Sequence, residues 1–165
     1  MRTTRNVLGS VLVSLGLVLL LAAPTATAEA MRPFRADFTG QAVFTPTATP
    51  GVLAGATSGA GRAAHFGRVS LSSTELLDFA SAPGSLLLRD GRMVMVAANG
   101  DELYWSYEGG GPLPRADGTA VFSGTFVITG GTGRFADAAG SGSFDGVGSV
   151  ADGGAAIAYT GTISY

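Results

Sequence analysis

The chain has 165 residues, with 26 glycines, no cysteine and no lysine, and its ten arginines against twelve acidic residues leave a net charge of −2. This length fits an export segment followed by one domain. The lack of cysteine excludes disulfides and a lipid-modified cysteine anchor, and a mildly acidic chain without a basic cluster argues against nucleic acid or an anionic membrane as partner.

Residues 1–30 have the pattern of a signal peptide. Two arginines precede an apolar run over residues 7–23, and two overlapping A-x-A cleavage sites end at Ala28 and Ala30. The apolar run is nearly long enough to span a membrane, but the tandem cleavage sites favour removal. We therefore predict a secreted protein whose single domain covers residues 31–165 and which keeps no stable membrane anchor.

The mature end provides a direct test of this prediction. Protein recovered from the culture medium should begin at Glu29 or Met31, as N-terminal sequencing would show. An intact Met1 on membrane-bound protein would contradict the signal peptide.

The first part of the domain indicates strands separated by turn-rich segments. Residues 34–44 alternate apolar and polar side chains, which is typical of a strand with one buried face. Residues 45–61, rich in proline, threonine, alanine and glycine, predict a loop. Residues 63–72 predict a second strand, in which Phe66 falls on one face and Val69 and Leu71 fall on the other. Ser72-Ser-Thr-Glu75 matches a capping box, which predicts a short helical turn over residues 76–80.

The middle of the domain indicates three short strands. Residues 85–89 predict one strand that ends in a turn at Asp90-Gly91. Residues 93–98 and 101–107 then flank Asn99-Gly100, which favours a two-residue hairpin with a type I′ turn.

Counting outward from this hairpin turn gives a register. It pairs Val96 with Leu103 and Val94 with Trp105. The alternation of Leu103, Trp105 and Tyr107 then agrees with that of the preceding strand.

The rest of the chain predicts three more strands. After a loop over residues 108–118, alternation returns in residues 119–129, 141–147 and 155–165. The prediction is therefore eight strands in an all-β domain. Pairing the last strand with the first would remove both edges and give an eight-stranded antiparallel closed barrel.

A glycine-rich turn lies between two of these strands. Gly130, Gly131 and Gly133 are expected to supply positive φ angles, with Phe135 following them. Gly131–Ala136 also fits the G-x-G-x-x-G/A dinucleotide fingerprint. That fingerprint needs a crossover helix and a second parallel strand, and too few residues follow the glycines for either. We expect no nucleotide or other cofactor.

The glycine-rich turn resembles the signature of the allene oxide cyclase and dirigent superfamily. Ala63-Ala-His65-Phe-Gly67, Ala97–Leu103 and Gly161–Tyr165 extend the resemblance over most of residues 34–165. The resemblance implies a calycin-like barrel, and relatives often assemble as dimers or trimers. It also implies an apolar interior, which in the plant cyclases contains a glutamate and a cysteine near the reacting atoms. Here cysteine is absent, and the pattern places no glutamate inward.

Four side chains are candidates for ligand binding. Trp105, Tyr107 and Tyr159 fall on the inward face of predicted strands, and His65 is the only histidine. Each also has a structural interpretation, because core packing is the commoner role of inward aromatic residues and a hydrogen-bonded histidine is commoner than a catalytic one. One histidine without cysteine predicts no metal site.

Inward glycines leave the function open between two interpretations. Gly40, Gly124, Gly142, Gly146 and Gly161 could relieve crowding in a packed barrel or could leave room for a ligand. The main hypothesis is a secreted barrel that binds or shields a small apolar molecule. A barrel-type cyclase or isomerase that acts by shape is the alternative, and a structural or surface-interaction protein with a solid core is the third.

Arg134 follows the glycine-rich turn. We expect its side chain to lie on the surface, where it either pairs with Asp137 or contacts an anion.

Overall fold

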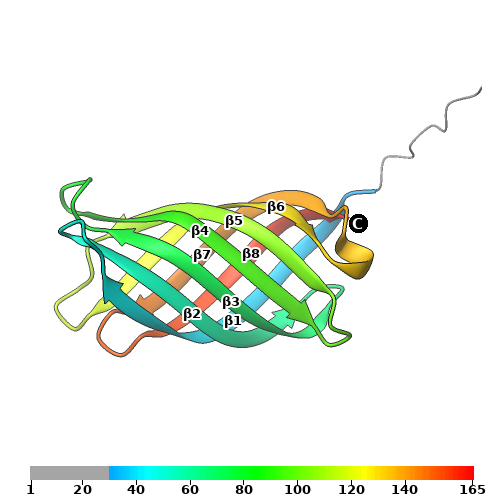
Figure 1. Cartoon of the computed structure of the whole chain (residues 1–165), viewed down its shortest axis with the longest axis horizontal. Helices are drawn as coiled ribbons and strands as arrows, with labels where there is room; N and C mark the ends of the chain where they lie inside the picture. The colour runs from blue at the N-terminus through cyan, green and yellow to red at the C-terminus, as the bar shows by residue number, and fades with distance from the viewer. Residues whose placement is uncertain (1–29) are drawn as a thin grey trace, which may run out of the picture.

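The computed structural model describes residues 30–165, which form one closed barrel of eight antiparallel strands (Figure 1). The predicted signal peptide lies outside these residues, apart from Ala30. No helix within residues 30–165 is long and apolar enough to cross a bilayer. The elements are β1 (Arg32–Pro46), β2 (Val52–Ala63), β3 (Gly67–Asp78), β4 (Ser85–Ala97), β5 (Glu102–Pro112), β6 (Thr119–Gly131), the 3₁₀ turn η1 (Gly133–Phe135), β7 (Ala139–Ser149) and β8 (Gly154–Ser164).

The predicted closure between the first and last strands is confirmed. β1 pairs with β8 over ten residues, with Ala36 opposite Tyr159 and Phe38 opposite Ile157. The remaining strands each pair with the next along the chain, so none of the strands within residues 30–165 has an unpaired edge. Closure alone removes the edges at which such sheets aggregate.

The prediction of a loop over residues 45–61 is wrong, because residues 52–63 form β2. Its inward face is built largely from glycine, so it lacks the alternating large side chains that reveal a strand. A Cβ on Gly59 would lie 2.2 Å from the carbonyl oxygen of Thr39, and one on Gly61 would lie 2.5 Å from the Phe38 ring. Neighbouring strands therefore occupy the space that side chains of β2 would need.

The predicted helical turn over residues 76–80 is also wrong, since β3 runs on to Asp78. The capping-box pattern in Ser72–Glu75 belongs to a strand whose odd-numbered residues point inward. Ser73 and Leu77 are buried and Glu75 is half-buried. The alternation continues past the bulge between Thr74 and Leu76, where the register with β4 shifts.

The two predicted strands at residues 85–89 and 93–98 are one strand, β4. The predicted turn at Asp90-Gly91 is a bulge, because β3 pairs with β4 on both sides of it: Leu76 lies opposite Arg89 and Thr74 opposite Arg92. Asp90 has a φ of +54°, which a bulge accommodates without ending the strand. The predicted total of eight strands was therefore right through two compensating errors.

The hairpin between β4 and β5 forms, but its predicted register is off by one residue. Met95 lies opposite Leu103 and Met93 opposite Trp105, so the methionines rather than the valines share the inward face with Trp105. Only Gly100 in the turn has a positive φ, +88°. The turn therefore has three residues and a left-handed glycine, and is not type I′.

Gly100→Val should lower the free energy of unfolding by roughly 1–3 kcal/mol, because a β-branched residue is strained at positive φ. No atom lies within 4 Å of a Cβ at this position, so the effect comes from the backbone alone. Thermal melts check it against Ala98→Val, which also places a valine in this turn but at a position without positive φ. Equal melting temperatures for the two variants would contradict the turn geometry.

Asp78 holds the β3–β4 connection at the end of the barrel opposite η1. This fully buried carboxylate accepts hydrogen bonds from the backbone N–H groups of Ala80 and Ser81, both at 2.9 Å, and from the Ser81 hydroxyl at 2.6 Å. It also pairs with Arg89 at 2.6 Å. These contacts, led by the Ser81 hydroxyl, lower the pKa of Asp78 to about 2.

Asp78→Asn should destabilise the protein in a pH-dependent way. The stabilisation by the ionised carboxylate is fully present above the ordinary aspartate pKa near 4. It is lost as the pH falls from there through about 2. Melting temperatures of wild type and variant should thus differ at pH 7 and converge toward pH 2. Asp145→Asn, on the outer face of β7, is the control; a difference independent of pH would contradict this role.

Candidate functional site

The end of the barrel that carries η1 is closed by aromatic side chains. Phe135 is fully buried and stacks on Phe66 with ring centroids 4.4 Å apart, and Tyr165 packs edge-on against Phe135 at 4.9 Å. The Arg134 guanidinium lies 4.5 Å above the Phe135 ring and donates a hydrogen bond of 2.9 Å to the backbone oxygen of His65. This end is therefore sealed against solvent.

The glycine-rich turn that leads into this plug meets only part of its prediction. Gly130 and Gly133 have positive φ angles of +123° and +55°, as expected, but Gly131 does not. A Cβ on Gly131 would lie 2.1 Å from the carbonyl oxygen of Glu102, so close approach of the backbone requires this glycine. Arg134 is exposed, as expected, but its guanidinium contacts aromatic rings and a backbone oxygen rather than Asp137.

The middle of the barrel is packed by a cluster of rings around Tyr159. Its ring centroid lies 5.4–5.6 Å from those of Phe38, Trp105, Phe126 and Phe144. Tyr159 and Trp105 are each only 2 % exposed. The ring cluster therefore fills the middle of the barrel and leaves no room there for a ligand.

A cavity of about 70 Å³ remains between this cluster and the other end of the barrel. Every strand contributes residues to its walls, as does the β7–β8 connection. The cavity is smaller than a pocket for a drug-sized ligand but exceeds the space of one water molecule. Its lining includes Ala42, Phe44, Thr57, Ser73, Glu75, Leu77, Leu86, Leu88, Tyr107, Ala120, Phe122, Phe144, Ala155, Ile157 and Tyr159.

A carboxylate in this apolar lining is the most unusual feature of the interior. Glu75 Oε2 accepts hydrogen bonds from the Tyr107 hydroxyl at 2.7 Å and from the Ser73 hydroxyl at 3.2 Å. Glu75 Oε1 accepts a longer bond, 3.4 Å, from Thr57. Strands β2, β3 and β5 together therefore hold one carboxylate against the cavity.

The two tyrosines beside Glu75 stay protonated over the ordinary pH range. Burial is the main cause that raises the pKa of Tyr107, and the charge of Glu75 adds to it. Burial also raises the pKa of Tyr159, against a smaller opposing effect of the Trp105 indole N–H. Both phenols are therefore hydrogen-bond donors at neutral pH.

The buried indole N–H of Trp105 lies near enough to the Tyr159 hydroxyl to lower the pKa of that phenol, but the two groups do not meet the geometry of a hydrogen bond. Among the described residues, Trp105 Nε1 is the buried side-chain nitrogen or oxygen for which no hydrogen-bond partner is found. Such a group costs free energy unless a bound molecule or water satisfies it. Its neighbour Tyr159 lines the cavity, so the orphan donor lies next to the candidate site.

The structure brings together three of the four side chains predicted to bind a ligand. Tyr107 and Tyr159 line the cavity, and Trp105 packs directly beneath Tyr159. His65 is separate: it is exposed on the β2–β3 turn at the sealed end, with Nε2 3.1 Å from the backbone oxygen of Pro33. This contact and its φ of +72° give His65 a structural place in the turn.

Glu75 is the residue that the sequence analysis missed. Continuing the period of two from Val69 and Leu71 through Ser73 would have placed Glu75 inward. The capping-box pattern favoured a helix and hid this signal. The expectation that no glutamate points inward is therefore wrong.

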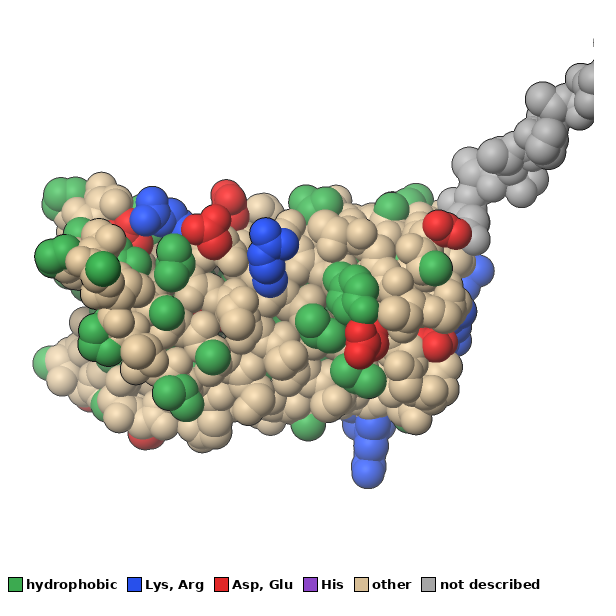
Figure 2. Space-filling model, viewed as in Figure 1, with side chains coloured by type: hydrophobic (Ala, Val, Ile, Leu, Met, Phe, Trp, Pro, Cys, Tyr) green, Lys and Arg blue, Asp and Glu red, His purple; other side chains and the backbone are tan. Residues whose placement is uncertain are grey.

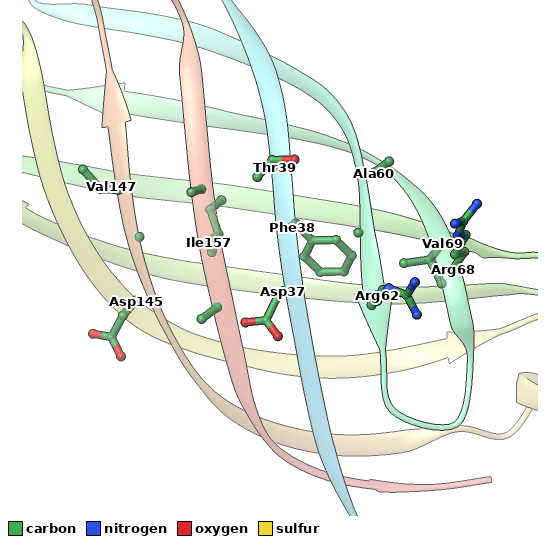
Figure 3. Close-up of a pocket in the computed structure, with 14 residues that line it drawn as sticks. Asp37, Phe38, Thr39, Ala60, Arg62, Arg68, Val69, Asp145, Val147 and Ile157 are labelled. Atoms are coloured by element: carbon green, nitrogen blue, oxygen red, sulfur yellow. The ribbon is translucent and has the colours of Figure 1, made fainter.

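A larger hollow of about 920 Å³ lies on the outer wall, over β7, β8 and β1–β3 (Figure 3). Its lining includes the small outward residues Thr39, Ala60, Ala156 and Ala158. The face of the barrel drawn in Figure 2 carries scattered charged and hydrophobic side chains on a mostly tan surface. Asp37, Arg62, Arg68 and Asp145 stand around the hollow. It is more open to solvent than the interior cavity, so it offers a ligand less desolvation.

The chemistry available at the cavity is hydrogen bonding and proton transfer. Residues 30–165 contain no cluster of three or more histidine, aspartate or glutamate side chains that could hold a metal ion. The fold and site thus define a small closed β-barrel with one carboxylate in an apolar end cavity. Comparisons with protein-family models, curated proteins and solved structures found no match.

Proposed function

We propose that this protein binds one small, mainly apolar molecule in the cavity at the end of the barrel opposite η1. The observation that carries the proposal is Glu75, a carboxylate held by Tyr107 and Ser73 in a cavity otherwise lined mostly by apolar side chains. A purely structural core gains nothing from an inward charge, and such departures from the hydrophobic pattern are expected at functional sites. The resemblance of the glycine-rich turn to the allene oxide cyclase and dirigent superfamily, and the predicted export signal, support a secreted binding barrel of that kind.

A pair of matched variants tests where binding occurs. Ala155 lines the cavity, whereas its neighbour Ala156 is exposed on the outer wall. We expect 1-butanol to shift the backbone NMR signals of cavity residues saturably. Ala155→Leu, which fills the cavity, should abolish these shifts, and Ala156→Leu should leave them unchanged. Shifts that survive Ala155→Leu, or that never appear, would contradict the proposal.

A barrel-type cyclase or isomerase is the second candidate, and the same cluster favours it. A carboxylate beside a protonated phenol can accept a proton from a bound molecule while the phenol donates one. Native mass spectrometry of protein from its own culture medium should reveal the bound molecule. Incubation with fresh protein would return it unchanged for a binding protein and convert it to an isomer of equal mass for an enzyme. Protein without any bound molecule would favour the third hypothesis, a structural barrel.

A further inference from the structure

We propose that the ligand is a small organic cation, an amine with a short apolar body whose ammonium group binds Glu75. This inference rests on the proposed function and adds the charge of the ligand to it.

Glu75 has no cationic partner among the described residues. It alone carries a charge among the side chains that line the cavity, and the ion pair found within residues 30–165 joins Arg89 to Asp78 instead. Protein hydroxyls orient the carboxylate but do not neutralise it. Because a half-buried charge is stabilised most by an opposite charge, the missing component of this site is a cation.

The hydrogen bonds of Glu75 also leave room for a donor. Its Oε2 already accepts from Tyr107 and Ser73, but Oε1 accepts only the 3.4 Å contact from Thr57. A carboxylate oxygen has capacity for two good donors. An ammonium group brings three donors and no acceptor, so it fits Oε1 better than an ether, ester or carboxylate would.

The walls around Glu75 suit a cation with an apolar body. Five aromatic residues line the cavity, and their rings attract cations as well as apolar groups. The β5–β6 and β7–β8 connections at this end carry two acidic residues, Asp117 and Asp152, and one basic residue, Arg115. The electrostatic potential of these connections therefore does not oppose the approach of a cation. The aromatic residues are Phe44, Tyr107, Phe122, Phe144 and Tyr159.

The volume of the cavity limits the part of the ligand that it encloses. A space of about 70 Å³ holds a head group and a few carbon atoms. A short alkylamine is therefore the matched probe. It remains charged at pH 7, like the amine of lysine.

The experiment compares n-butylammonium, 1-butanol and butanoate, which share an apolar chain and differ in charge. NMR titrations of the purified protein give a dissociation constant for each, from signals of cavity residues. We expect n-butylammonium to bind about tenfold or more tightly than 1-butanol, as expected for a charge-assisted hydrogen bond, and butanoate to bind most weakly. Glu75→Gln should remove the preference for ammonium, so that n-butylammonium no longer binds more tightly than 1-butanol. Glu108→Gln, which removes an exposed charge from the outer face of β5, should preserve the preference.

The outcomes separate this inference from the proposed function. Equal binding of all three probes, tightest binding of butanoate, or an ammonium preference that survives Glu75→Gln would overturn the assignment of a cation while leaving a binding barrel. Absence of all three probes from the cavity would overturn both proposals. Tyr107→Phe keeps the charge of Glu75, so it should keep a preference for ammonium; its loss in this variant would also count against the charge as the cause.

Discussion

Tyr159→Ala should lower the free energy of unfolding by about 3–5 kcal/mol, the usual effect of removing a large aromatic side chain from a packed core. Tyr159 is 2 % exposed and its ring contacts four other aromatic rings. Removal of the ring would leave a void that is continuous with the end cavity. Urea denaturation followed by circular dichroism measures the effect.

Tyr159→Phe is the matched control for this large loss. It keeps the ring and removes only the hydroxyl, so it should change stability by less than about 1.5 kcal/mol. A loss below about 1 kcal/mol for Tyr159→Ala would mean that the middle of the barrel is more open than the ring contacts indicate.

Removal of residues 154–165 should convert the protein into an aggregate rather than a weakened monomer. β8 pairs with β1 on one side and β7 on the other. Its loss leaves two unpaired edges and exposes much of the apolar inner face, both of which promote association between chains. Size-exclusion chromatography with light scattering distinguishes the outcomes.

A complementation experiment controls for the length of the truncated chain. A separate peptide of residues 154–165 should restore soluble protein, because it can supply the pairing that both edges lost. A soluble, monomeric truncated protein without the peptide would contradict the role of β8 in closing the barrel.

The strands that the sequence predicts best are those that carry their own large residues. Residues 119–129 carry Ala120, Phe122, Phe126 and Ile128 at alternate positions, with Gly124 between the two phenylalanines, and β6 places all four inward. The same holds for Tyr159 and Ile163 in β8. A period of two is a local property of the chain, so local pattern suffices to identify these strands.

The candidate site depended on features that local pattern does not contain. The hydroxyl of Tyr107 and the carboxylate of Glu75 are 32 residues apart in sequence and meet at 2.7 Å only because β3, β4 and β5 are neighbours in the barrel. The bulge in β4 also sets which side of the strand faces inward on either side of Asp90. No spacing within a single strand predicts such a contact.

For this chain, the sequence by itself determined an all-β domain closed by pairing of its first and last strands, together with three inward aromatic residues of the site. The tertiary structure decided that residues 52–63 form a strand, that the middle of the barrel is packed, and that Glu75 faces a cavity. The physical reason lies in shared volume. In β2, Gly59 and Gly61 leave their inward space to a neighbouring strand and to the Phe38 ring, so the facing of these residues is visible only once their neighbours are in place.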